Sequence, residues 1–129
     1  MFLCLENHTN NNLETIEDYD EIFTHAPSTY IGYCVDTGHV DASGILLSDV
    51  VRHFPTKINH LHLKETIQFG VEKFVRFGQG VTNIPEFVER MIDIGYSGYM
   101  SVELAIPDKS DVIHDLTVTY EMFSKYEKA

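Results

Sequence analysis

Four short apolar runs in the sequence each end in a side chain that can bind a metal ion or move a proton. These side chains are Glu6, Asp36, His62 and Glu103. Three carboxylates with one imidazole form an oxygen-rich ligand set that suits Mn²⁺, Mg²⁺ or Co²⁺ and also accommodates Zn²⁺. Taken singly, each residue is an ordinary solvated carboxylate or rim histidine, so the repetition carries the interpretation. The pattern predicts one divalent-metal site with an open coordination position for a substrate.

The stretch 31–40, I-G-Y-C-V-D-T-G-H-V, shows how such a side chain is placed. The β-forming residues up to Val35 predict a strand, whereas the D-T-G-H segment that begins at Asp36 has the composition of a turn. A carboxylate therefore ends the strand, and the imidazole of His39 follows three residues later. In parallel α/β folds, ligands bind beyond the carboxyl ends of the strands, so both groups are candidate site residues.

The same alternation of strand and helix occurs four times along the chain. Apolar runs predict strands at 2–5, 31–35, 58–63 and 99–104, and helical spacing predicts helices at 15–26, 45–54, 85–94 and 108–123. A capping-box pattern at Thr15 and the Pro107-Asp108 pair are predicted helix starts. Strands that alternate with helices imply a parallel sheet with right-handed crossovers. Either a small doubly wound sheet or half of an eight-fold barrel, which needs ~250 residues when complete, fits this pattern.

In a parallel sheet the residues at the strand ends converge on one rim. Strand side chains alternate between faces, so the residues two positions earlier point the same way as the predicted ligands. Those residues are Cys4, Cys34, His60 and Ser101. We therefore expect a small, polar layer of side chains beneath the metal site.

Composition narrows the class of protein. The 129 residues are 43% hydrophobic and carry 20 acidic against 9 basic side chains, a formal charge of −11. That charge repels phosphate backbones and argues against a nucleic-acid partner, whereas it suits a cation site. The chain shows neither the basic region of a signal peptide nor an apolar run of membrane-spanning length, so we expect a cytoplasmic protein with no membrane partner. Cys4 and Cys34 lack metal-ligand spacing and are expected to be free thiols.

Several motifs together resemble the sugar phosphate isomerase/epimerase superfamily, the xylose isomerase-like TIM barrels. They are E-N-H from Glu6, D-T-G-H from Asp36, H-L-H-L-K-E from His60, G-Q-G from Gly78 and G-Y-S-G-Y-M-S-V-E-L from Gly95. The resemblance covers essentially the whole chain in order, but only the carboxyl-terminal half of that barrel, strand-helix units five to eight. It implies an α/β fold, a parallel (β/α)4 half of a TIM barrel that forms a single domain over residues 1–129.

The resemblance also implies a metal-dependent sugar or sugar phosphate isomerase or epimerase. The ligands of one divalent ion would be Glu6, Asp36, His62 and Glu103. The carboxylates of Glu6 and Glu103 would also remove and return a proton next to a carbonyl, and the cation would stabilise the resulting enediolate. The side chains that contact the small sugar-like substrate would be His8, His39 and Lys64.

Departures from the family pattern leave other functions open. Gln68 stands where the epimerase branch usually has an arginine, and Glu65 replaces the more usual aspartate, which leaves the role of Glu65 open. Val75-Arg76-Phe77 stands in the region where the apurinic endonuclease branch has an Asp-x-His metal motif, which argues against phosphodiester cleavage. A single-metal dehydratase acting on inosose or dehydroshikimate is the main alternative. A half-barrel that holds ligands but has no activity of its own is another.

A half-barrel would also leave two strand edges unpaired, at residues 2–5 and 99–104. Neither strand has the mid-strand proline or inward charge that protects exposed edges. Because half of each interior layer would be absent, the side chains expected to face water are Cys4, Cys34, His60 and Tyr99. We therefore expect the chain to form a homo-oligomer or to require a separate amino-terminal half-barrel.

Overall fold

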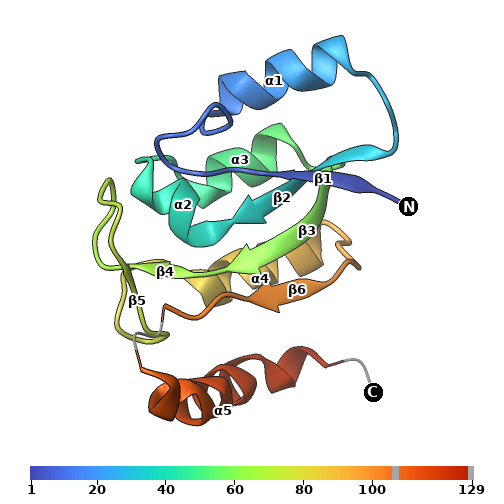
Figure 1. Cartoon of the computed structure of the whole chain (residues 1–129). Coiled ribbons are helices and arrows are strands. Elements are labelled where there is room, and N and C mark those ends of the chain that lie inside the picture. Colours follow the sequence, from blue (N-terminus) through green and yellow to red (C-terminus); the bar gives the residue numbers. More distant parts are fainter. Residues whose placement is uncertain (106–107, 128–129) are drawn as a thin grey trace.

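A parallel sheet organises the chain. The computed structural model describes residues 1–105 and 108–127, and Figure 1 shows the course of the chain. The sheet strands are β1 (Leu3–Glu6), β2 (Ile31–Asp36), β3 (Ile58–Leu63) and β6 (Met100–Val102), and their spatial order is β1-β2-β3-β6. All three pairings are parallel. Because the strands lie side by side in chain order, the half-barrel prediction is confirmed and the doubly wound alternative, in which the two orders differ, is wrong.

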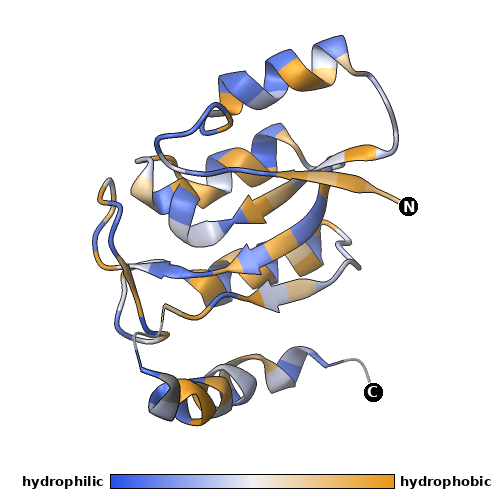
Figure 2. Ribbon diagram, in the orientation of Figure 1, coloured by the Kyte–Doolittle hydropathy of each residue, from blue (hydrophilic) through white to orange (hydrophobic). Residues whose placement is uncertain are grey.

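The helices that connect or follow these strands cover one face of the sheet. They are α1 (Ile16–His25), α3 (Leu47–His53), α4 (Ile84–Asp93) and α5 (Val112–Phe123). Alternate strand residues such as Tyr33, Val35 and Leu61 pack against the helices and form the core. The Tyr19 ring of α1 stacks on Tyr33 with the ring centroids 3.8 Å apart. Figure 2 shows the resulting alternation of hydrophobic and hydrophilic residues along β2 and β3.

The predicted helix starts correspond to local hydrogen bonds where the structure describes them. Thr15 caps α1, since Asp18 N donates to its Oγ1 at 3.2 Å and Thr15 N donates to the Asp18 carboxylate at 2.7 Å. Pro85 lies in the first turn of α4, and Gly95 follows its end with a φ of +83° that favours glycine. Pro107 lies outside the described residues. A 3-10 turn at Lys109–Asp111 leads into α5 at Val112.

The turn predicted after β2 is wrong, because the segment is a short helix, α2 (Thr37–Ala42). Asp36 serves as its N-cap: the His39 backbone N–H donates to Asp36 Oδ1 at 2.9 Å. The residues that suit a turn, Asp and Thr before Gly, also suit a helix start, and the cap decides between them. The helix predicted at 45–54 begins two residues later, at Leu47.

The long loop after β3 contains a hairpin that the sequence pattern did not predict. Its strands are β4 (Glu65–Thr66) and β5 (Phe74–Val75), and they pair antiparallel. The strands are only two residues each, which is too short for an alternating pattern to be recognised. The hairpin extends the rim of the sheet at the carboxyl end of β3 (Figure 1).

The polar layer beneath the rim forms as expected, with one correction. His60 Nε2 lies 2.9 Å from Ser101 Oγ, and Cys34 lies beside His60. Cys34 does not face water, since only 4% of it is exposed. It lies on β2, an inner strand with β1 and β3 on its two sides. Tyr99 is 85% exposed, as expected for the β6 edge.

The edges of the sheet follow from its strand order. Among the described residues, β1 pairs only with β2, and β6 pairs only with β3.

Both cysteines are free thiols, as expected. None of the described helices is long and apolar enough to cross a membrane.

Candidate metal centre

The structure brings together all four predicted metal ligands. Glu6 ends β1, Asp36 ends β2, His62 lies one residue before the end of β3, and Glu103 follows β6. One ligand atom from each of Glu6, Asp36, His62 and Glu103 lies within 4.8 Å of all the others. The parallel register explains this, because it sets Asp36 opposite His62 and His62 opposite Ser101. The cluster lies at the rim where parallel folds bind their ligands.

Asp36 is the most deeply buried member of the cluster, with 0% of its surface exposed. Its Oδ1 accepts the α2 cap bond, whereas its Oδ2 is buried without a hydrogen-bond partner among the described residues. Lys64 Nζ lies 3.7 Å from that oxygen. Burial raises the pKa of Asp36 to about 6, although the His39 N–H and the Lys64 charge oppose the rise. A cation bound beside Oδ2 would satisfy this oxygen.

The other three ligands form contacts around the same space. His62 Nδ1 lies 2.5 Å from Glu6 Oε1 and 3.8 Å from Glu103 Oε2. Lys64 Nζ lies 2.7 Å from Glu103 Oε1. Partial burial raises the pKa of Glu103, but the hydrogen bond and charge of Lys64 outweigh burial, so its pKa lies below the ordinary value. This donor set consists of three carboxylates and one imidazole, and it includes the unsatisfied buried Oδ2 of Asp36. It fits a divalent ion with oxygen-rich coordination.

Asn7 positions the Asp36 ligand, and the sequence reasoning missed it. Its side chain is 1% exposed and makes two hydrogen bonds with the Asp36 backbone. Asp36 N donates to Asn7 Oδ1 at 2.9 Å, and Asn7 Nδ2 donates to Asp36 O at 3.2 Å. The residue is the central letter of the E-N-H motif, so the signal was present. Only the folded sheet shows that it links the end of β1 to the end of β2.

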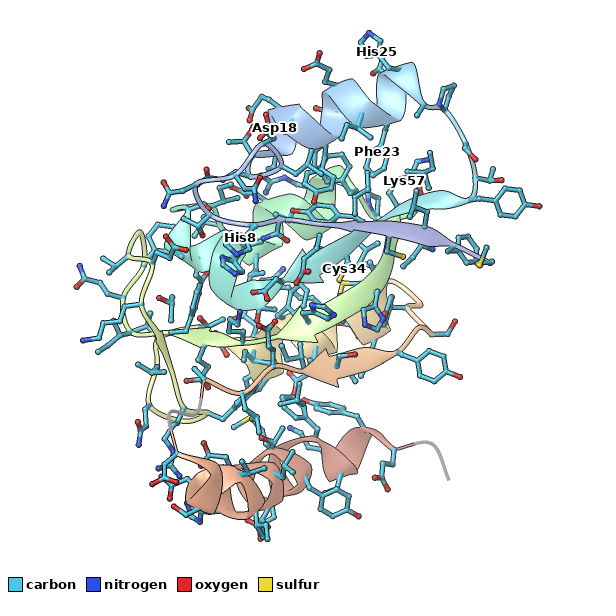
Figure 3. All side chains as sticks on the ribbon, in the orientation of Figure 1. His8, Asp18, Phe23, His25, Cys34 and Lys57 are labelled. Carbon is cyan, nitrogen blue, oxygen red and sulfur yellow. The ribbon has the colours of Figure 1, made fainter. Side chains whose placement is uncertain are left out.

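His8 and His39, two of the three predicted substrate-binding residues, pack ring against ring beside the metal cluster, with 33° between the ring planes. Their ring centroids lie 3.8 Å apart, and His8 projects from the end of β1 across α2 (Figure 3). His39 Nδ1 accepts a hydrogen bond from Thr9 N at 3.2 Å. Burial, followed by the charges of Lys64 and His8, lowers the pKa of His39 to about 4. His39 is therefore a neutral group near pH 7, and only 3% of it is exposed, with the rings of His8 and Phe74 packed against it.

Lys64, the third predicted substrate-binding residue, is held in place by contacts with α2 and β5. Its backbone N–H donates to Thr37 Oγ1 at 2.9 Å, and Thr37 Oγ1 donates to Lys64 O at 2.7 Å. A Cβ at Gly38 would lie 2.8 Å from Lys64 Cγ, so only glycine leaves room for the lysine stem. The ammonium lies 4.4 Å from the Phe74 ring centroid of β5. Neither Thr37 nor Phe74 was singled out from the sequence.

Glu65, whose role the sequence left open, stabilises the loop before α4. Its two carboxylate oxygens accept hydrogen bonds from Gly78 N at 2.9 Å and Gly80 N at 2.6 Å. A Cβ at Gly80 would lie 2.5 Å from Thr66 O, which explains the glycine there. The carboxylate is thus committed to the G-Q-G loop and does not belong to the metal cluster.

The fold and this rim define the class of protein: a parallel β/α barrel architecture with its polar groups at the carboxyl ends of the strands. The model of the xylose isomerase-like TIM barrel family matches residues 1–122. The chain therefore belongs to the xylose isomerase-like TIM barrel family.

Known proteins of this class match the chain over part of their own length. An inosose isomerase from Halalkalibacterium halodurans is 31% identical over 106 residues, which are 78% of this chain and 38% of that protein. The crystal structure of an IolI protein with a bound zinc atom matches with a TM-score of 0.78 and 24% identity, over 100% of this chain and 51% of that one. A probable 3-DHS dehydratase, AsbF from Bacillus anthracis, matches with a TM-score of 0.74 and 18% identity over 100% of this chain and 50% of that one. The chain thus spans between about two fifths and half of the length of these relatives.

Proposed function

We propose that the protein is a metal-dependent sugar or sugar phosphate isomerase or epimerase that transfers a proton at the carbon next to a carbonyl. One observation carries the proposal: four ligand atoms, from Glu6, Asp36, His62 and Glu103, lie within 4.8 Å of one another. The inosose isomerase relative supports this reaction class. The zinc atom in the IolI structure supports a divalent ion as the cofactor, with Mn²⁺, Mg²⁺ and Co²⁺ as further candidates.

The proton transfer uses two carboxylates of the cluster. A divalent ion, when bound, supplies positive charge beside the substrate oxygens and lowers the cost of breaking the adjacent C–H bond. Either Glu6 or Glu103 takes the proton from that carbon, which leaves an enediolate, and the other carboxylate returns a proton. Return from the opposite side inverts the carbon, and return to the neighbouring carbon interconverts an aldose and a ketose.

Three neighbouring side chains position the substrate in this proposal. Lys64 Nζ, 2.7 Å from Glu103 Oε1, donates a hydrogen bond to a substrate oxygen beside the reacting carbon. His8 and His39 form the adjoining wall. Desolvation by these side chains strengthens the electrostatic interactions of the site, because fixed protein groups replace water around the reacting oxygens.

A hydro-lyase is the second candidate. The likeness to the probable 3-DHS dehydratase AsbF supports it, since the same single-metal rim can follow proton removal by loss of a hydroxyl group. Both reactions begin with the same C–H bond breakage. They differ in whether water leaves, so one assay separates them.

The test is deuterium exchange in D₂O. The Mn²⁺-loaded chain is incubated with scyllo-inosose or D-tagatose, and proton NMR follows loss of the signal next to the carbonyl. We expect exchange by the wild type, a loss of about 10²-fold or more in Glu103→Gln, and wild-type rates in the control Glu121→Gln on the exposed side of α5. Formation of an unsaturated ketone would establish the hydro-lyase instead. Absence of exchange with both scyllo-inosose and D-tagatose, or an unchanged exchange rate in Glu103→Gln, would contradict the proposal.

A further inference from the structure

Beside the metal centre lies a second polar cluster, in which Glu72 joins the two histidines of the proposed substrate wall. It consists of His8 after β1, His39 on α2 and Glu72 in the β4–β5 hairpin. One nitrogen or carboxylate oxygen from each residue lies within 4.8 Å of the others. Nothing in the sequence motifs pointed to Glu72. We call these three residues the hairpin subsite.

The hairpin holds Glu72 in a defined place. Asn10 Nδ2 donates to Glu72 Oε2 at 2.8 Å across 62 residues of sequence, and Asn10 itself has a left-handed φ of +59°. The Thr66 hydroxyl lies 2.6 Å from Val71 O and 3.1 Å from Lys73 O, which closes the hairpin from inside. The Asn10 hydrogen bond orients the Glu72 carboxylate without neutralising it, and the Thr66 contacts hold the backbone on either side of it.

The hairpin subsite is continuous with the metal centre through Phe74. The Phe74 ring centroid lies 4.6 Å from the His39 ring and 4.4 Å from Lys64 Nζ. Lys64 in turn contacts Glu103 of the metal cluster. In the proposed function, a substrate whose carbonyl lies at the metal cluster would therefore extend its far end toward Glu72.

The hydrogen-bonding groups of the subsite match hydroxyl groups. His8 Nδ1 donates to Thr9 O at 2.9 Å, so Nε2 is an acceptor in the neutral form of the His8 ring. His39 Nδ1 accepts from Thr9 N, so its Nε2 carries a proton and is a donor rather than a metal ligand. Glu72 is an acceptor. A hydroxyl both donates and accepts, and can therefore satisfy this mixed set, whereas a phosphate dianion has only acceptors.

The charge of the subsite points the same way. Glu72 is negative, and Asn10 N also contacts the Glu14 carboxylate at 2.9 Å. Among the residues that the structure describes, no lysine or arginine forms an ion pair with Glu72, and Lys64 is already paired with Asp36 and Glu103. Phosphate sites rely on arginine, lysine or backbone N–H groups, so this arrangement repels a phosphate.

We propose that Glu72 determines substrate specificity by binding hydroxyl groups of an uncharged polyol, a sugar or a cyclitol, and by excluding phosphate esters. This inference rests on the proposed function and narrows it to unphosphorylated substrates. Glu72 touches the part of the substrate remote from the reacting carbon.

The experiment compares D-fructose with D-fructose 6-phosphate, which carries a phosphate on O6 and therefore cannot close the pyranose ring. The change of the affinity ratio in Glu72→Gln separates the effect of charge from that of the ring form. Binding to the Mn²⁺-loaded chain is measured by calorimetry, which requires no turnover. We expect the wild type to bind D-fructose about tenfold or more tightly than its phosphate. Glu72→Gln, which keeps the shape and removes the charge, should reduce this ratio about tenfold. The control Glu121→Gln changes the net charge equally and should leave the ratio unchanged.

Four results would overturn the inference: equal affinities in the wild type, an unchanged ratio in Glu72→Gln, binding of neither ligand, or a second equivalent of Mn²⁺ that Glu72→Gln abolishes. Discrimination by Glu72 in a protein that exchanges no protons would retain this inference and remove the proposed function. Proton exchange without discrimination would retain the proposed function and remove this inference.

Discussion

Replacing Asp36 by asparagine tests whether the metal centre is held at a cost in stability. Asp36 is fully buried, and burial raises the pKa of its carboxyl from 3.8 to about 6. A shift of roughly two units corresponds to about 3 kcal/mol at neutral pH. Because the pKa in the folded protein exceeds that in the unfolded chain, this penalty is absent below pH 3.8 and grows until the pH passes about 6.

Asparagine should retain most of the local structure. Its Oδ1 can accept the His39 N–H that caps α2, and its amide would lie near Glu103, one ligand oxygen of which is within 4.8 Å of an Asp36 oxygen. A donor that is less well satisfied offsets part of the gain, so we expect the metal-free variant to be more stable by about 1 to 3 kcal/mol at pH 7. At pH 4 the difference should be small.

The assay is urea unfolding in EDTA at pH 4 and pH 7, at one protein concentration, with Asp93→Asn on the exposed end of α4 as the control. Addition of Mn²⁺ at about 100 times its Kd should then stabilise the wild type by about 2.7 kcal/mol and leave Asp36→Asn unchanged. A metal-free Asp36→Asn protein that is less stable than the wild type at pH 7, or a difference that does not grow with pH, would refute this reasoning.

Three further predictions concern metal binding, the core and association. In calorimetric titration with Mn²⁺, His62→Ala should bind the ion about 100-fold or more weakly than the wild type, whereas the control His25→Ala, at an exposed position on α1, should bind it equally well. The Mn²⁺ affinity of the wild type should fall as the pH drops, because protons compete for the ligands. Equal binding by both variants would remove His62 from the site. Phe87→Ala, at a position 2% exposed, should lower the free energy of unfolding by about 3 to 5 kcal/mol in urea titration, and a loss below about 1 kcal/mol would show that this part of the core is not packed as described. Light scattering after size exclusion should give a particle larger than 14.8 kDa for the chain alone, because the outer edges of β1 and β6 are apolar and have no strand partner within residues 1–105 and 108–127. A cooperatively unfolding monomer would contradict this expectation.

Much of the architecture could be predicted from the sequence because its signals are local. Apolar runs, the Thr15 cap and the prolines and glycines that flank helices specify the order of strands and helices, and a repeated strand-helix order leaves a parallel sheet as the arrangement with suitable connections. The positions of Glu6, Asp36, His62 and Glu103 at strand ends then place them on one rim. Their convergence could be predicted because parallel strands share a direction.

The groups that position these ligands could not be predicted, because their contacts join distant parts of the chain. Asn7 reaches Asp36 across 29 residues, and Asn10 reaches Glu72 across 62. The D-T-G-H segment suits a turn and a helix start equally well, and the hydrogen bond from His39 N to Asp36 selected the helix. The residue types and the chain direction thus determined the four candidate ligands. Tertiary contacts alone decided the burial of Asp36, the packing of His8 against His39 and the placement of the hairpin, because each depends on side chains that meet only after the sheet has formed.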